Sequence, residues 1–220
     1  MPDLMNRYAE SVLRVAEASA GTVRVTQIGE MILQPGKRPL RFDAVEEFTV
    51  ERVAFAWRAR FPLLGPLAMR VVDSYDGRDG LLEVRVLGVP VQRKRGPELA
   101  RGEVYRYLAE TPWVPQAIVS NPHLEWRELD EYGVEVATQV AGEHLRLRLI
   151  FNEAGEITQT VAARPRLEAG GEVTRWVGEY RDYTSFGGIR MPGHGEVRWE
   201  LPEGPFTYWR GTITAVEAPA

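Results

Sequence analysis

Cysteine is absent from this sequence of 220 residues, and histidine occurs only three times. Without cysteine the chain cannot form disulfides, thiolate metal sites, iron–sulfur clusters or a thiolate nucleophile. The histidines show neither the HExxH nor the HxH spacing of zinc sites. The Walker, GxGxxG and Gly-x-Ser-x-Gly motifs are missing as well. We therefore expect neither a histidine-based zinc site nor one of the common nucleotide-binding enzymes.

Long apolar runs are also missing. No segment approaches the ~18 apolar residues that a membrane-spanning helix needs, and Asp3, Arg7 and Glu10 interrupt the region where a signal peptide would be apolar. The net charge of −4 and the charged content of 26% are ordinary for a soluble globular protein. We expect a cytoplasmic chain that has no membrane span and does not bind nucleic acid.

Apolar and polar residues instead alternate through most of the chain, in runs separated by turns rich in proline and glycine. Phe55, Trp57 and Ala59 fall on one face of such a run, whereas Arg58 and Arg60 fall on the other. This alternation predicts antiparallel strands with one buried face. We expect strands near residues 22–33, 39–50, 53–61, 66–75, 81–87, 124–129, 133–141, 144–152, 155–167, 172–183, 187–201 and 206–216.

Two segments have the period of a helix. Leu4, Tyr8 and Val12 recur at spacings of four, which predicts an amphipathic helix over residues 4–18. Residues 97–111 begin with a proline and are rich in glutamate, leucine and alanine, which predicts a central helix. The expected fold class is mainly β, with one domain over residues 1–220. Its β cup, over residues 22–216, is a curved antiparallel sheet or half-barrel of about 10–12 strands, plugged by the central helix.

Two acidic residues fall in the buried register of predicted strands. Asp73 alternates with Met69 and Val71, and Glu46 alternates with Ala44 and Phe48. A carboxylate that faces a core has to be hydrogen-bonded, paired with a charge or used in chemistry. The alternative is that each carboxylate is simply solvated, as Asp73 would be at the end of its strand.

Three charged residues share one face of the predicted central helix. Glu103, Arg106 and Glu110 are spaced by three and four residues. One interpretation is an exposed ladder of ion pairs, which adds little stability. The other is that this face lines the mouth of the cup, where two carboxylates separated by an arginine bind a metal or perform acid–base chemistry.

A later block combines aromatic rings with glycine and acid. Trp176, Tyr180 and Asp182 alternate on one side of a predicted strand, and this side either belongs to the core or binds a ligand. His194 lies in a Pro-Gly-His-Gly turn, where it is either an ordinary turn residue or the histidine best placed to act as a base. Arg190, shortly before it, is available to stabilise developing negative charge.

Distinct blocks of sequence accompany the strand pattern: Tyr107-Leu108-Ala109-Glu110-Thr111-Pro112-Trp113-Val114-Pro115, Trp176-x-Gly-x-Tyr-x-Asp-Tyr, Gly188-Ile189-Arg190-Met191-Pro192 and Tyr208-Trp209-Arg210-Gly211. Together they resemble an uncharacterised bacterial family of unknown function, which implies no activity. The strand pattern with its covering helix is similar in architecture to the half-barrels of Lol-type lipoprotein carriers and to lipocalin-like cups. That resemblance implies a cavity for apolar ligands and no reaction.

Our main hypothesis is a β cup that binds an apolar or amphipathic small molecule or a lipid. The alternative is an ester or phosphoester hydrolase, whose inward carboxylates act as bases or hold a divalent metal. A third hypothesis, a structural or interaction domain, needs an exposed apolar patch, which the arginine-rich outer positions disfavour. The catalytic candidates are Asp73, Glu103, Arg106, Glu110 and His194. The ligand-binding candidates are Glu46, Trp57, Tyr75, Trp113, Trp176, Tyr180, Asp182, Arg190 and Trp199.

Overall fold

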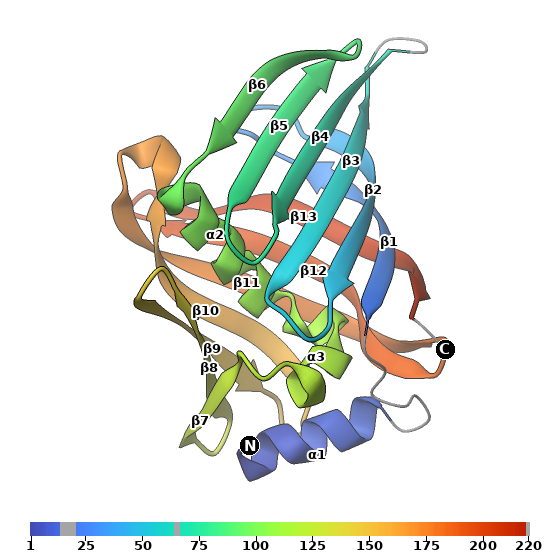
Figure 1. The fold of residues 1–220 in the computed structure, drawn as a ribbon, viewed down its shortest axis with the longest axis vertical. Helices are drawn as coiled ribbons and strands as arrows, with labels where there is room; N and C mark the ends of the chain where they lie inside the picture. The colour runs from blue at the N-terminus through green and yellow to red at the C-terminus, as the bar shows by residue number, and fades with distance from the viewer. Residues whose placement is uncertain (14–20, 64–66, 219–220) are drawn as a thin grey trace.

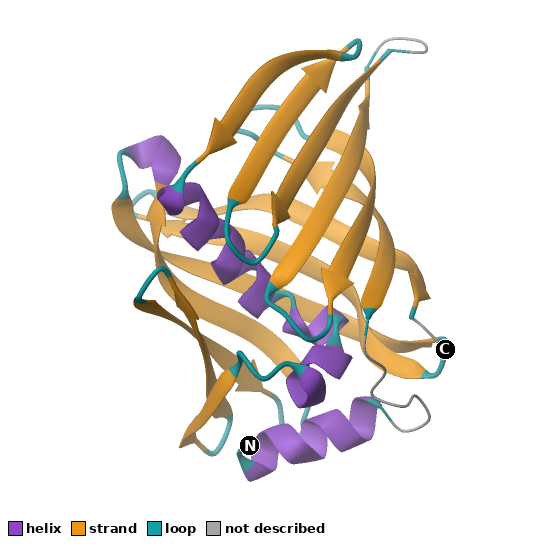
Figure 2. Cartoon of the chain, viewed as in Figure 1, coloured by secondary structure: helices purple, strands orange, loops and turns teal. Residues whose placement is uncertain are grey.

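The computed structural model describes residues 1–13, 21–63 and 67–218. Within these ranges the chain folds into one antiparallel sheet of thirteen strands, which is curved and open at both edges (Figure 2). The predicted fold class, mainly β with a curved antiparallel sheet, is confirmed.

The sheet consists of two halves that meet where β1 pairs with β13. Within each half, strands that follow one another in the chain are hydrogen-bonded neighbours. The first half contains β1 Thr22–Met31, β2 Leu40–Thr49, β3 Ala54–Pro62, β4 Ala68–Tyr75, β5 Gly80–Val86 and β6 Val89–Arg95. The second half contains β7 Glu125–Asp130, β8 Gly133–Val140, β9 Glu143–Phe151, β10 Ile157–Arg166, β11 Glu172–Phe186, β12 Ile189–Leu201 and β13 Gly204–Glu217.

Alternating side chains give the sheet an inner and an outer face. In β2 the side chains of Phe42, Ala44 and Phe48 are buried, whereas Arg41 and Asp43, on either side of Phe42, are exposed. Removing apolar surface from water is favourable by roughly 25 cal/mol per Å², so the apolar face turns inward. The inner side chains of both halves join in one continuous core.

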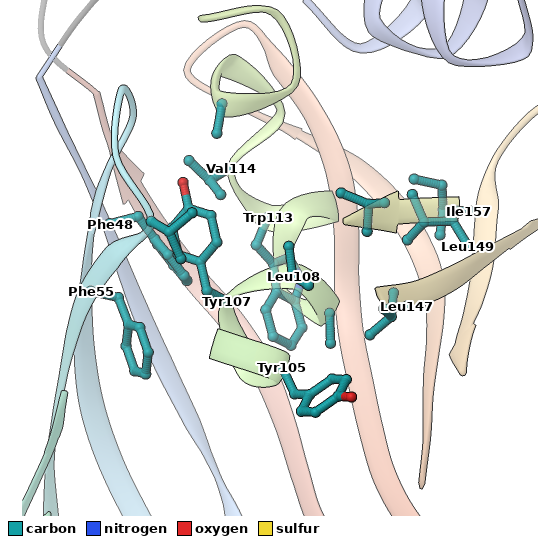
Figure 3. Packing of buried hydrophobic residues seen from close by; sticks show 14 of the residues in the cluster. Phe48, Phe55, Tyr105, Tyr107, Leu108, Trp113, Val114, Leu147, Leu149 and Ile157 are labelled. Carbon is teal, nitrogen blue, oxygen red and sulfur yellow. The ribbon is translucent and has the colours of Figure 1, made fainter. Parts of the chain in front are cut away.

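The central helix α2 bridges the two halves. It lies across the concave side of the sheet (Figure 1) and packs against strands of both halves. Figure 3 shows Tyr107 of α2 beside Phe48 on one side, with Leu147 and Leu149 on the other. No helix in the described ranges is long and apolar enough to cross a membrane. The helices are α1 Asp3–Val12, α2 Pro97–Ala109, η1 Thr111–Trp113, α3 Pro115–Ser120 and η2 Leu167–Ala169, where η marks a 3-10 helix.

The structure contains two elements that were not predicted, and one predicted helix extends beyond the described residues. Strand β6 was not expected, because all of its residues are exposed and no apolar alternation reveals it. The short helix α3 follows α2 after the break at Pro112, where only one helix was predicted. The N-terminal helix ends at Val12, and the predicted residues 14–18 lie outside the described residues.

Candidate functional site

Arg106 stands at the centre of a buried group of acidic side chains. Its guanidinium donates hydrogen bonds to Glu46 Oε1 at 2.7 Å, to Asp73 Oδ2 at 3.0 Å and to Glu110 Oε1 at 2.8 Å. The same guanidinium lies 5.2 Å from the ring centroid of Trp57. Helix α2 supplies Arg106, Glu110 follows directly after this helix, and strands β2 and β4 supply the other two acids.

Glu103 completes this group, which we call the Arg106 cluster: Glu46, Asp73, Glu103, Arg106 and Glu110. Burial raises the pKa of Glu46, Asp73 and Glu103, and the attraction of Arg106 only partly offsets it. Glu103 lies beside Asp73, and Glu46 lies beside Glu110, so that each pair can share a hydrogen bond when one of its two carboxyl groups is protonated. Asp73 Oδ1 and Glu110 Oε2 have no other hydrogen-bond partner among the described residues.

The cluster is a closed network. Glu46 is fully buried, and Gln27 Nε2 donates to its second oxygen at 2.9 Å. Among the described residues no set of three or more acidic or histidine side chains is arranged to hold a metal ion. The network ties α2 to β2 and β4, and it can take up or release protons. Gln27 was not predicted, although it occupies the buried register of β1 together with Val23 and Val25.

Four of the five catalytic candidates therefore meet in one place. Glu103 and Glu110 are only 6% and 8% exposed, which excludes the exposed ladder of ion pairs. Asp73 and Glu46 bind Arg106, which excludes the interpretation of solvated strand ends. Sequence alternation was sufficient to orient the two strand acids, because each shares its register with buried neighbours.

His194 does not join them. Its neighbour Gly195 faces the interior, so His194 points to the convex face, where its Nδ1 lies 3.1 Å from Thr212 Oγ1. Its Nε2 lies 3.5 Å from a carboxylate oxygen of Glu196. Burial and the nearby Arg181 lower the pKa of His194. The sheet separates this imidazole from the Arg106 cluster, so the two cannot act on one substrate.

Asp182 is not on the inner face, and the predicted alternation is wrong at this point. Its φ of 60° interrupts the ladder between β11 and β12, and its side chain is 74% exposed. Tyr183 turns inward instead and donates from its hydroxyl to the carbonyl of Ile157 at 3.0 Å. Arg190 stacks over Tyr183 at 5.0 Å and pairs with Glu156 at 2.6 Å.

Trp113 and Tyr180 pack α2 and η1 onto the second half of the sheet. The indole Nε1 of Trp113 donates to the Pro192 carbonyl at 2.9 Å. The Tyr180 hydroxyl donates to the Ala109 carbonyl at 2.7 Å, and the two rings meet edge to face at 5.4 Å. Both side chains are buried among protein groups, which supports the core alternative for them.

Trp176 and Trp199 form a second aromatic group, with ring centroids 6.4 Å apart. The guanidinium of Arg164 lies 4.7 Å from the ring of Trp176. Arg164 was not predicted, although it shares its register in β10 with the inner residue Ala162. Tyr75 lies apart from both groups, in the wall of a polar cavity of about 460 Å³ between the β4–β5 turn and β8.

One part of the inner face is apolar but only partly covered. In β4, Val71 and Met69 lie opposite Ala59 and Phe61 of the buried face of β3. Val84 and Val86 of β5, which pair with them, are also partly exposed. The same is true of Met31 in β1 and its partner Leu40 in β2. We call this surface the apolar strip; it consists of Met31, Leu40, Met69, Val71, Val84 and Val86.

The sequence also matches the model of a protein family. The model of a family of unknown function, DUF6544, matches residues 1–211. The chain belongs to DUF6544. The resemblance to an uncharacterised family that the sequence blocks indicated is confirmed. No curated protein matches this DUF6544 chain significantly.

Solved structures similar to the DUF6544 chain include a LolA superfamily protein from Nitrosomonas europaea, with 10% identity and a TM-score of 0.50 over 99% of this chain and 92% of that one. A domain named for outer membrane lipoprotein sorting, from Vibrio parahaemolyticus, has 10% identity and a TM-score of 0.49 over 95% and 92%. A DUF1329 family protein from Desulfovibrio piger has 9% identity and a TM-score of 0.47 over 98% and 93%. The first of these shows that the chain shares the fold of that LolA superfamily protein.

Proposed function

We propose that the chain binds the acyl chain of a lipid, or a similar amphipathic molecule, along the apolar strip. The observation that carries this proposal is the partial exposure of the strip on the inner face of the sheet. An exposed apolar surface on the concave side of a sheet gains free energy, roughly 25 cal/mol per Å², when an apolar ligand covers it.

Buried aromatic side chains lie beside the strip on the same inner face of the sheet. Phe42 contacts Trp57 at 5.4 Å, Phe61 at 5.7 Å and Trp209 at 6.0 Å, measured between ring centroids. Rings packed in this way form a rigid wall, and a preformed wall lowers the entropy cost of binding. The fold shared with a LolA superfamily protein is a further support, since it is an open cup.

The hydrolase hypothesis stays a prediction. Its carboxylates are engaged with Arg106 and with each other, and its histidine candidate lies on the other face of the sheet. No observation in the described structure favours ester or phosphoester cleavage over binding.

Adjacent residues of β4 provide a matched test of the strip. Val71 faces inward, whereas Val72 lies between Arg58 and Glu83 on the outer face. Purified protein would be titrated with a fluorescent fatty acid. We expect Val71→Lys to weaken binding by about tenfold or more, because a charge in the strip has to be desolvated. Val72→Lys places the same charge in solvent and should leave binding unchanged.

Thermal unfolding of both variants shows whether each is folded. The proposal would be rejected if the unaltered protein takes up no fatty acid, or if the two folded variants lose binding equally.

A further inference from the structure

Three hairpins of the first half-sheet turn at the same end of the molecule. Because neighbouring strands are antiparallel, the β1–β2, β3–β4 and β5–β6 connections lie at the same end of their strands, and Figure 1 shows the β5–β6 turn at the top, near the upper ends of β3 and β4. Each turn exposes large aliphatic side chains: Leu33 is 62% exposed, Leu63 45%, Leu67 42%, Leu87 63% and Val89 62%. We call residues 32–41, 60–63, 67–72 and 84–92 the rim.

The rim has an unusual charge for this chain. It contains no aspartate or glutamate, and its six basic residues are Lys37, Arg38, Arg41, Arg60, Arg70 and Arg85. The whole chain carries −4, so the remainder carries −10, and three of its acids, Glu30, Asp43 and Glu83, lie at the base of the rim. The turns at the opposite end of the same strands carry both signs, with Glu51 next to Arg52 and Asp76 near Arg78.

Some of this charge is paired at the base of the rim. Arg85 contacts Glu83 at 2.6 Å, and Arg93, further along β6, lies 3.6 Å from the same carboxylate. Arg60 lies 3.8 Å from the carboxylate of Asp43. Nearer the tips, Lys37 and Arg38 are exposed and form no ion pair with any described residue. The outermost part of the rim is therefore both apolar and positively charged.

Leu87 occupies a backbone position that disfavours leucine. Its φ is 54°, and Gly88 after it has a φ of 81°. A two-residue hairpin turn with both angles positive strongly favours asparagine or aspartate followed by glycine. Leu87 gains no core contact in exchange, since it is largely exposed. A strained backbone at a residue whose aliphatic side chain is exposed indicates that this side chain has a role outside the folded core.

We propose that the rim docks on the surface of an anionic lipid bilayer. The aliphatic tips enter the headgroup region, and the basic residues contact acidic headgroups. Separate apolar points surrounded by positive charge suit a deformable, negatively charged surface better than one rigid protein partner. The inference rests on the proposed function, because docking brings the lipids of the bilayer close to the apolar strip.

The test is co-sedimentation of the full chain with phosphatidylcholine vesicles that contain or lack phosphatidylglycerol. We expect binding only to the anionic vesicles, and less binding at high salt. The double variant K37Q/R38Q should bind about tenfold or more weakly, because each basic residue near such a surface contributes to the attraction. The matched control R52Q/R78Q removes the same charge from the opposite turns and should bind normally.

A second variant separates docking from folding. Leu87→Asn removes the aliphatic tip and suits the positive φ, so its thermal midpoint should stay equal or rise while vesicle binding falls. Equal binding to neutral vesicles, no binding at all, or unchanged binding by Leu87→Asn would overturn the inference. Fatty acid uptake by the same variants should be normal. Failed docking with normal uptake rejects the rim alone, and failed uptake with normal docking rejects the proposed function alone.

Discussion

At the scale of single residues, Arg106 faces more carboxyl groups than one cation can neutralise. The acids of the cluster are held at close range in a dry environment, where like charges repel strongly. Burial favours the protonated forms of Glu46, Asp73 and Glu103, and this lowers the repulsion within the cluster. The folded cluster therefore retains protons more strongly than the unfolded chain does.

This arrangement predicts that stability depends on pH. The pKa values of Glu46, Asp73 and Glu103 are raised in the folded state by burial, so the folded chain holds protons that the unfolded chain has released. This stabilisation is fully present below the unfolded pKa of about 4.3 and is lost as pH rises towards the folded values. We expect the urea midpoint to fall as the pH rises above about 4.3.

Glu103→Gln keeps a hydrogen-bond donor but cannot titrate. It should make the decline of stability with rising pH less steep, because it removes a carboxyl group whose pKa is raised by burial. Glu47→Gln alters a carboxylate on the outer face that pairs with Arg58, and it serves as the control. A decline of equal steepness in Glu103→Gln would contradict the assignment of its proton.

The sequence predicted part of this cluster. The inward direction of Asp73 and Glu46 followed from strand alternation, which is a local property. Their shared partner Arg106 did not follow, because it depends on how α2 is rotated above the sheet. The prediction for Asp182 was wrong because its positive φ reverses which side chains face inward beyond it. Neither neighbour of Asp182 in the chain is a glycine or a proline, so the sequence contains no sign of this change.

At the scale of elements, close packing of η1 on β12 depends on a residue without a side chain. A Cβ built on Gly195 would lie 2.6 Å from the indole of Trp113, which is held in place by its bond to Pro192. Gly102 in α2 is different, since a Cβ there would meet only the mobile end of Arg164, at 3.0 Å.

These two glycines predict opposite effects of one substitution. Gly195→Ala should destabilise the fold by about 1–3 kcal/mol through overpacking. Gly102→Ala should stabilise it by up to about 1 kcal/mol, because alanine is the better helix former. Urea unfolding of both variants measures the difference. Equal effects would show that the helix and the sheet are not packed as described.

The elements that the sequence predicted are those with a buried face. β2 and β3 were recognised because their inner residues are apolar. β6 was missed because it is an edge strand with every side chain exposed. Its basic residues protect the edge from pairing with another chain, and the same residues conceal the strand from pattern analysis.

At the scale of the whole molecule, the sheet is continuous only because β1 pairs with β13. Thr26 and Gln27 of β1 lie at the bulge of this ladder, beside Ala215 and Ile213. Without β13, both β1 and β12 would become open edges in the middle of the sheet. Open edges with unpaired backbone groups promote aggregation.

Truncation after Leu201 should therefore abolish the native monomer, although most of the core residues are still present. Size-exclusion chromatography and circular dichroism would show aggregated or unfolded protein. The control is truncation after Glu217, which leaves every strand intact. A soluble monomer with native-like strand content, lacking residues 202–220, would show that the two halves fold independently.

The pairing of β1 with β13 also determines how late in translation the sheet can be completed. β1 ends at Met31 and β13 begins at Gly204, so β1 leaves the ribosome long before its second partner exists. At about 5–20 residues per second the delay is roughly 10–35 seconds. Throughout that interval one edge of the nascent first half-sheet is unpaired. The cell has to shield it, which makes the chain a candidate client for chaperones that act during translation.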